Sequence, residues 1–182
     1  MSADRLSQWQ ADEAAVRAAM TLPPGTIPIA DALTRPGIDV LRDMIAGRVP
    51  VPPICGAMNY LLVQVEPGVA VFQGRPDARF LNPLGSLHGG WYATLLDSAL
   101  GCAVHTTMQA GRGYTTLEMK MNLVRAIGPE VQLVRAQGRT IHVGRQTATA
   151  EAQLVGPDGK LYAHGSTTCL IFDALPAKAK TP

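Results

Sequence analysis

The sequence predicts an α+β fold in which a curled antiparallel sheet, of about five to six strands, wraps one long central helix. Residues 89–108 read as a single, nearly all-apolar helix. Such a helix must be covered on most of its sides. Apolar and polar residues alternate on both sides of this segment, as in half-buried strands. Helix-forming composition before residue 55 adds an N-terminal helical extension.

The length of 182 residues allows one domain with a full core and is too short for two of ordinary size. We expect an N-terminal extension, or cap, over residues 1–55, ended by the prolines at 50–53. The main domain is expected over 56–172. Residues 173–182 lack an apolar pattern and are expected to form a flexible tail.

Two strands joined by a Pro–Gly turn are expected before the central helix, and a four-strand antiparallel meander after it. Tight-turn sequences at 143–145 and 156–159 imply antiparallel neighbours. The first strand of the meander places Thr116, Glu118 and Lys120 on its polar face. The expected helices are 3–20, 36–47 and 89–108, and the expected strands are 59–66, 69–73, 116–123, 131–143, 146–155 and 160–172.

Composition excludes several classes of protein. A net charge of +2 is too small to indicate nucleic acid, and no basic stripe alternates with aromatic residues. The first ten residues lack the features of a secretory signal, and Asp97 interrupts the longest apolar stretch, so we expect a cytoplasmic protein without a membrane span. The three cysteines, Cys55, Cys102 and Cys169, have no metal-ligand spacing and are expected as buried thiols. No metal or cofactor is expected.

Asp97 is the only formally charged side chain between His88 and Arg112. A carboxylate in apolar surroundings loses hydration at a cost of several kcal/mol unless something compensates. A catalytic role is the leading interpretation. The alternatives are that Asp97 has a structural role or faces water.

The segment before the central helix, residues 82–90, is rich in residues that permit sharp turns. Gly89 and Gly90 suit a helix start that a ligand approaches closely. The first N–H groups of a helix have no internal acceptor and can hold a carbonyl oxygen as it becomes an oxyanion. The alternative is that the two glycines only let a tight loop enter the helix.

Asp97 lies roughly 12 Å along the helix from Gly89, at a rise of about 1.5 Å per residue. This distance is too long for both residues to touch one reacting carbon within one chain. A two-fold dimer would bring the start of one helix beside Asp97 of its neighbour and would create two equivalent sites.

These residues together resemble a known family. Asn82, the sequence at 87–90, Asp97, the sequence at 115–119 and Gly165 look like the pattern of PaaI-like acyl-CoA thioesterases of the hotdog superfamily. The resemblance covers residues 56–172. It implies a hotdog fold, assembly as a dimer or a dimer of dimers, and hydrolysis of an acyl-CoA to a carboxylic acid and free CoA.

The resemblance also implies roles for individual residues. Asp97 would act as general base on water or as nucleophile, and Gly89 would present its N–H to the thioester oxygen. Asn82 would help to orient the thioester or the water, and Thr116 would help to hold water near Asp97. His88 is expected to shape the loop by hydrogen bonding, with direct proton transfer as the alternative.

Two other functions remain open. A dehydratase or hydratase acting on acyl thioesters would use a histidine and a carboxylate jointly, and its Gly-Asp-x-Asn-Pro-x-His loop is missing here. A non-catalytic acyl-CoA-binding module is the second alternative.

Two features leave the substrate open. Ala126 stands where many relatives have proline, and the long N-terminal extension could close over an acyl pocket.

Arginines suit phosphate oxygens, and the candidates for contact with CoA are Arg112, Arg125, Arg135, Arg139 and Arg145.

Overall fold

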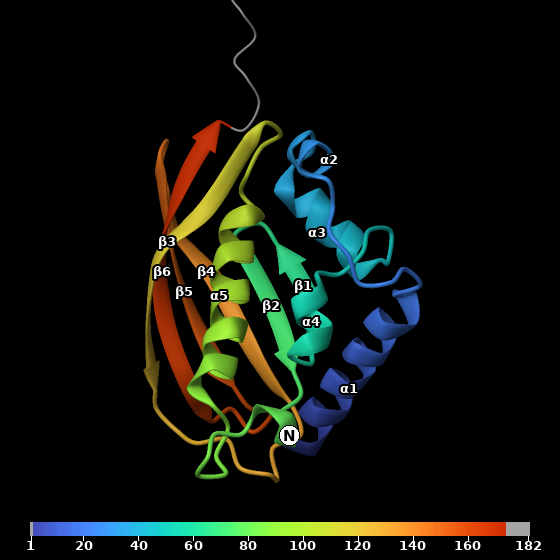
Figure 1. Ribbon diagram of the computed structural model, residues 1–182, viewed down its shortest axis with the longest axis vertical. Coiled ribbons are helices and arrows are strands. Elements are labelled where there is room, and N and C mark those ends of the chain that lie inside the picture. The colour runs from blue at the N-terminus through green and yellow to red at the C-terminus, as the bar shows by residue number, and fades with distance from the viewer. Residues whose placement is uncertain (1, 174–182) are drawn as a thin grey trace, which may run out of the picture.

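A computed structural model describes residues 2–173, which form a six-stranded antiparallel sheet curled around one long helix, α5 (Figure 1). This architecture confirms the predicted fold class. The predicted tail at 173–182 lies, apart from Asp173, outside the described residues. The strands, in the order in which they lie side by side, are β1 (Tyr60–Glu66), β2 (Val69–Gly74), β4 (Val134–Val143), β5 (Thr147–Val155), β6 (Leu161–Asp173) and β3 (Arg112–Leu123).

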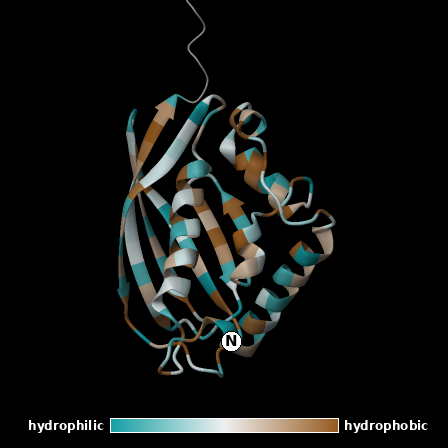
Figure 2. Cartoon of the chain, viewed as in Figure 1, coloured by the Kyte–Doolittle hydropathy of each residue, from teal (hydrophilic) through white to brown (hydrophobic). Residues whose placement is uncertain are grey.

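Helix α5 (Gly89–His105) packs against the inner face of the sheet. Its sheet-facing side chains, including Leu96 and Leu100, are fully buried. A side-chain carbon at Gly138 would lie 2.1 Å from the carbonyl oxygen of Ala99, so only glycine lets β4 pass this close to the helix. Hydrophobic and hydrophilic residues alternate along the strands in Figure 2, as the period-two pattern predicts.

The strand order contradicts the predicted meander. β3 pairs with β6 at one edge of the sheet, while β4 pairs with β2 and β5. The connection between β3 and β4, residues 124–133, is long enough to carry the chain across the sheet. The turns that follow β4 and β5 are short, and they join antiparallel neighbours as predicted.

Four helices precede β1: α1 (Ser2–Ala19), α2 (Ile29–Leu33), α3 (Gly37–Ile45) and α4 (Pro53–Ala57), the last of which crosses the expected end of the extension at residue 55. The two longer ones, α1 and α3, are the two predicted helices. The five-residue helices α2 and α4 were not predicted, because so short a helix shows no apolar period. A short 3-10 helix, η1 (Ala78–Phe80), follows β2. No helix within residues 2–173 combines the length and apolar character that a membrane crossing requires.

Helix α1 is fastened to the sheet by a buried polar network. The Glu13 carboxylate accepts hydrogen bonds from Gln73 and Arg75, while Asp12 accepts one of 2.6 Å from Arg135. The guanidinium of Arg135 lies 4.6 Å from the centre of the Trp9 ring. Because α1, α3 and α4 all contact β1, the extension covers that edge of the sheet.

The opposite edge, formed by β3, carries exposed apolar side chains. Leu117 and Leu123 are 58% and 52% exposed, and Met119 and Met121 are half-buried. A shift in register between Thr116 and Glu118 marks a β-bulge at Leu117. The predicted apolar stripe of β3 is therefore present but only partly covered within one chain.

Candidate active site

The loop that leads into α5 is organised by Asn82. Its Oδ1 accepts hydrogen bonds from the N–H groups of Leu84 and Ser86, at 2.9 and 3.2 Å, and its Nδ2 donates to Oγ of Ser86 at 2.7 Å. Gly85 completes the turn with a φ of +79°, which favours glycine. Asn82 thus fixes the loop 82–88, with its amide oxygen engaged inside the turn.

His88 is the N-cap residue of α5 and immediately precedes Gly89, its first residue. Its Nδ1 accepts a hydrogen bond of 2.9 Å from the N–H of Gly90, so the imidazole caps the helix. This is the type of contact expected of a residue that shapes the loop. Among the described residues, no acceptor binds the N–H of Gly89. That N–H is therefore free to receive a carbonyl oxygen at the positive end of the helix dipole.

Asp97 lies on the face of α5 that the sheet leaves uncovered. It follows Gly90 and Thr94 along the helix, with steps of four and then three residues, which places all three on one side of the helix. The carboxylate is exposed in the single chain. The apolar sequence around Asp97 suggests that this carboxylate loses hydration, but in one chain alone it does not. The Thr116 hydroxyl, reaching over from β3, donates a hydrogen bond of 3.3 Å to Oδ1 of Asp97.

The residue after Asp97 in α5 makes a contact that sequence reasoning missed. Ser98 and Tyr60 share a hydrogen bond of 3.0 Å between α5 and β1. Burial, with smaller contributions from the charges of Cys55 and Asp97, raises the pKa of the Cys102 thiol to about 12. Burial also raises the pKa of Cys169. Since a thiol must ionise to attack, these cysteines are unsuited to act as nucleophiles.

The structure separates the five candidate arginines. Arg135 is buried against Asp12 and Gln73, and Arg112 pairs with Asp173. Arg139 lies on the outer face of the sheet. Arg125, Arg139 and Arg145 are exposed, and no ion pair joins any of the three to another described residue.

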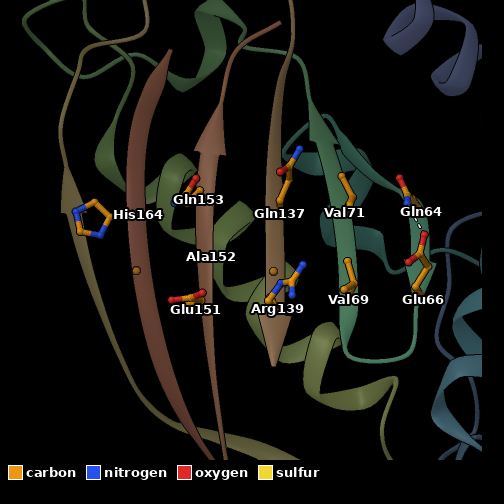
Figure 3. Close-up of a pocket in the computed structure, with 12 residues that line it drawn as sticks. Gln64, Glu66, Val69, Val71, Gln137, Arg139, Glu151, Ala152, Gln153 and His164 are labelled. Atoms are coloured by element: carbon orange, nitrogen blue, oxygen red, sulfur yellow. Dashed lines mark hydrogen bonds between the residues drawn. The ribbon is translucent and has the colours of Figure 1, made fainter. Parts of the chain in front are cut away.

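A hollow of about 530 Å³ lies on the outer face of the sheet, away from α5 (Figure 3). Arg139 and Glu151 face each other across neighbouring strands there, and the other side chains are mainly polar. Asp97, Gly89, Asn82, Thr116 and His88, the predicted catalytic residues, do not line this hollow. The outer face is therefore separate from the Gly89 and Asp97 site.

The architecture is that of the hotdog fold, in which an antiparallel sheet wraps one helix. Known proteins agree with this class. The family model of the thioesterase superfamily matches residues 84–163. Conserved protein PA5202 from Pseudomonas aeruginosa is 30% identical in sequence, and its structure gives a TM-score of 0.63 over 67% of this chain and 95% of that one. The chain therefore belongs to the thioesterase superfamily.

Further relatives place the chain near the PaaI-like members, as the sequence pattern predicts. A point mutant of the phenylacetic acid degradation protein PaaI from Thermus thermophilus is 29% identical, with a TM-score of 0.58 over 65% of this chain and 97% of that one. PA1618 from Pseudomonas aeruginosa, whose name describes a candidate esterase, is 35% identical over 85 residues. That match spans 46% of this chain and 57% of the relative.

Proposed function

We propose that the protein is an acyl-CoA thioesterase, which hydrolyses a thioester to a carboxylic acid and free CoA. The observation that carries this proposal is the pairing of Asp97 with Thr116 on the uncovered face of α5. The same helix begins with the N–H of Gly89, which has no acceptor among the described residues. Membership of the thioesterase superfamily supports the same reaction.

In the proposed mechanism, the Gly89 N–H donates a hydrogen bond to the thioester oxygen and stabilises the oxyanion. Asp97 accepts a proton from water, whose oxygen attacks the carbonyl carbon. The carbon–sulfur bond then breaks, and the proton passes to the sulfur of CoA. If Asp97 attacks the carbonyl carbon directly instead, the carbon–sulfur bond breaks, CoA leaves as its thiolate and a mixed anhydride forms; water then hydrolyses the anhydride and supplies the proton that CoA takes up. Thr116 holds the carboxylate, or the water beside it, in position.

The site is completed by a second copy of the chain. Gly89 and Asp97 are roughly 12 Å apart along α5, at about 1.5 Å per residue, so one thioester cannot reach both in one subunit. The exposed apolar side chains of β3, including Leu117 and Leu123, mark the edge at which a second copy would pair. Such a dimer would place Gly89 of one subunit beside Asp97 of the other.

The proposal is tested by measuring thiol release from a panel of acyl-CoA esters. We expect turnover by the wild-type protein and a loss of at least about a hundredfold in Asp97→Asn, with unchanged circular dichroism. Glu151→Gln, on the outer face, serves as the matched control. Near-wild-type turnover in Asp97→Asn would contradict the mechanism. Interconversion of enoyl and 3-hydroxyacyl thioesters without thiol release would indicate a hydratase instead.

A further inference from the structure

A hollow of about 440 Å³ opens beside the first turn of α5. His88 and Gly90, the residues on either side of Gly89, both line it. A thioester whose oxygen is bound to the Gly89 N–H therefore has one of its two arms within reach of this hollow. Its complete lining is Met58, Arg79, Phe80, Leu81, His88, Gly90, Trp91 and Thr94.

The walls of the hollow are largely apolar. The rings of Phe80 and Trp91 stack with their centroids 6.2 Å apart and their planes at 23°. Leu81 is 46% exposed, and Met58 is half-buried. Covering this surface with a hydrocarbon would remove apolar area from water on both sides of the contact, which favours binding.

Most polar groups of the lining already have a partner within the chain. The Thr94 hydroxyl donates to the carbonyl oxygen of Gly90 at 2.9 Å. Nδ1 of His88 accepts from the N–H of Gly90. The guanidinium of Arg79 makes two hydrogen bonds to the Asp77 carboxylate, at 3.0 and 3.1 Å, and lies over the Phe80 ring. A charged or hydroxylated ligand arm would lose hydration against the apolar walls, and a carboxylate would have to compete with Asp77 for Arg79.

The end of α4 holds Met58 in this wall. Nε1 of Trp91 donates a hydrogen bond of 2.8 Å to the carbonyl oxygen of Met58, which ties the end of α4 to α5. Asn59 follows with a φ of +53°, so the chain turns sharply into β1. The side chain of Met58 is thereby anchored at the hollow rather than carried on a free loop.

We propose that this hollow receives the acyl chain as an uncharged, unsubstituted hydrocarbon, and that Met58 limits the length of chain accepted. The inference rests on the proposed thioesterase function and assigns its substrate class. It also gives the junction between α4 and β1 a role, because Met58, the C-cap residue of α4, sets acyl specificity.

The test compares wild-type protein, Met58→Ala, Met58→Trp and the control Ile54→Ala, an exposed α4 residue outside the hollow. A series of saturated acyl-CoA esters is hydrolysed, and kcat/KM is plotted against chain length. We expect Met58→Ala to shift the optimum to longer chains, with a gain of about fourfold per additional buried methylene. Met58→Trp should shift it to shorter chains, and Ile54→Ala should match the wild type.

Adipoyl-CoA tests whether the hollow accepts a charged acyl chain, because it is hexanoyl-CoA with a terminal carboxylate in place of the methyl group. We expect its kcat/KM to be lower than that of hexanoyl-CoA by about tenfold or more. Equal rates for these two esters, or an unchanged length profile in both Met58 variants with native circular dichroism, would overturn the inference.

Binding of S-hexyl-CoA, a thioether that cannot be hydrolysed, separates the two proposals. One outcome is that the protein releases no thiol from any ester but binds S-hexyl-CoA, and that Met58→Trp weakens this binding. That outcome would overturn the thioesterase proposal and support the hollow as the acyl-binding site. The other outcome is that thiol is released but neither turnover nor thioether binding depends on Met58. That outcome would overturn only the proposal that the hollow binds the acyl chain.

Discussion

The hydroxyl of Thr116 in β3 donates a hydrogen bond of 3.3 Å to the carboxylate of Asp97 in α5. The bulge at Leu117 makes this contact possible, because one extra residue reverses the alternation of side chains along the strand. Thr116 therefore faces the helix, while Glu118, two residues later, pairs with Thr168 on the outer face. A threonine from the sheet edge thus orients the carboxylate proposed to be catalytic.

Replacing Thr116 with valine should lower kcat by about tenfold, because a hydrogen bond to a charged group is lost while the shape of the side chain is kept. The KM for an acyl-CoA ester should change little, since Thr116 does not line the hollow proposed to bind the acyl chain. Steady-state kinetics of both variants, Thr116→Val and Thr116→Ser, provide the measurement. Serine retains the hydroxyl and should restore most of kcat; equal loss in both variants would contradict this role.

The sequence identifies Asp97 because it is an isolated charge in an apolar helix, and it identifies the fold because the strand and helix periods are clear. It assigns Thr116 to the polar face, together with Glu118 and Lys120, because no local signal marks the bulge at Leu117. The contact between Tyr60 and Ser98 is also hidden, since it joins residues that are 38 positions apart. Periodicity reports which face of an element is apolar, but it does not report bulges or long-range side-chain pairs.

The edge position of β3 could not be predicted for a related reason. A tight turn constrains the next strand to be a neighbour, whereas the connection 124–133 leaves the pairing to tertiary packing. The apolar stripe of β3 predicts a half-buried strand within one chain. Its exposed leucines are instead the feature that supports assembly with a second copy.

Replacing Gly89 with proline should remove one N–H group while keeping the helix. Proline is favoured at the first helical position, and His88 before it has the extended conformation, with φ −66° and ψ 136°, that proline requires. The nearest atom to an added side-chain carbon is Cδ1 of Leu123, a flexible side-chain end 3.2 Å away. If this N–H stabilises the oxyanion, kcat should fall by about a hundredfold or more.

Mixed dimers test whether the two groups act across subunits. Co-expression of Gly89→Pro and Asp97→Asn chains with different affinity tags gives heterodimers in which one shared site carries both changes and the other carries neither. Such heterodimers should recover about half of the wild-type turnover per dimer, if the two sites are independent. The Gly89→Pro and Asp97→Asn homodimers must both be folded and inactive. If the heterodimers are inactive as well, the Gly89 N–H and the Asp97 carboxylate of each site belong to one subunit.

Replacing Leu117 with lysine should convert the assembled protein to monomers. Charge at an exposed edge strand opposes pairing with another strand, and Leu117 is 58% exposed on β3. Sedimentation analysis at several concentrations measures the change, and turnover should fall together with assembly. Ile141→Lys on the interior strand β4, where the isoleucine is 61% exposed, is the matched control. Persistence of the wild-type assembly in Leu117→Lys would show that another surface holds the subunits.

The ion network beneath α1 predicts a pH-dependent stability. Burial alone would raise the pKa of Glu13, but hydrogen bonds from Arg75, Arg17 and Gln73 outweigh it and hold the pKa below the ordinary value of 4.5. Because the folded-state pKa is the lower one, the stabilisation is complete above about pH 4.5 and is lost as the pH falls through the folded-state value. The contribution of Glu13 to the free energy of unfolding should therefore decrease as the pH falls below about 4.5.

Glu13→Gln should reduce the free energy of unfolding by about 1–3 kcal/mol at neutral pH, because Glu13 is only 2% exposed and its buried partners lose a charged acceptor. Urea denaturation at a series of pH values provides the measurement. The difference from the wild type should shrink as the pH falls below 4.5, where the wild-type carboxylate also becomes neutral. Asp39→Asn removes an exposed ion pair with Arg42 and should have almost no effect at any pH. A difference for Glu13→Gln that stays constant down to acidic pH would show that packing, rather than charge, fastens α1 to the sheet.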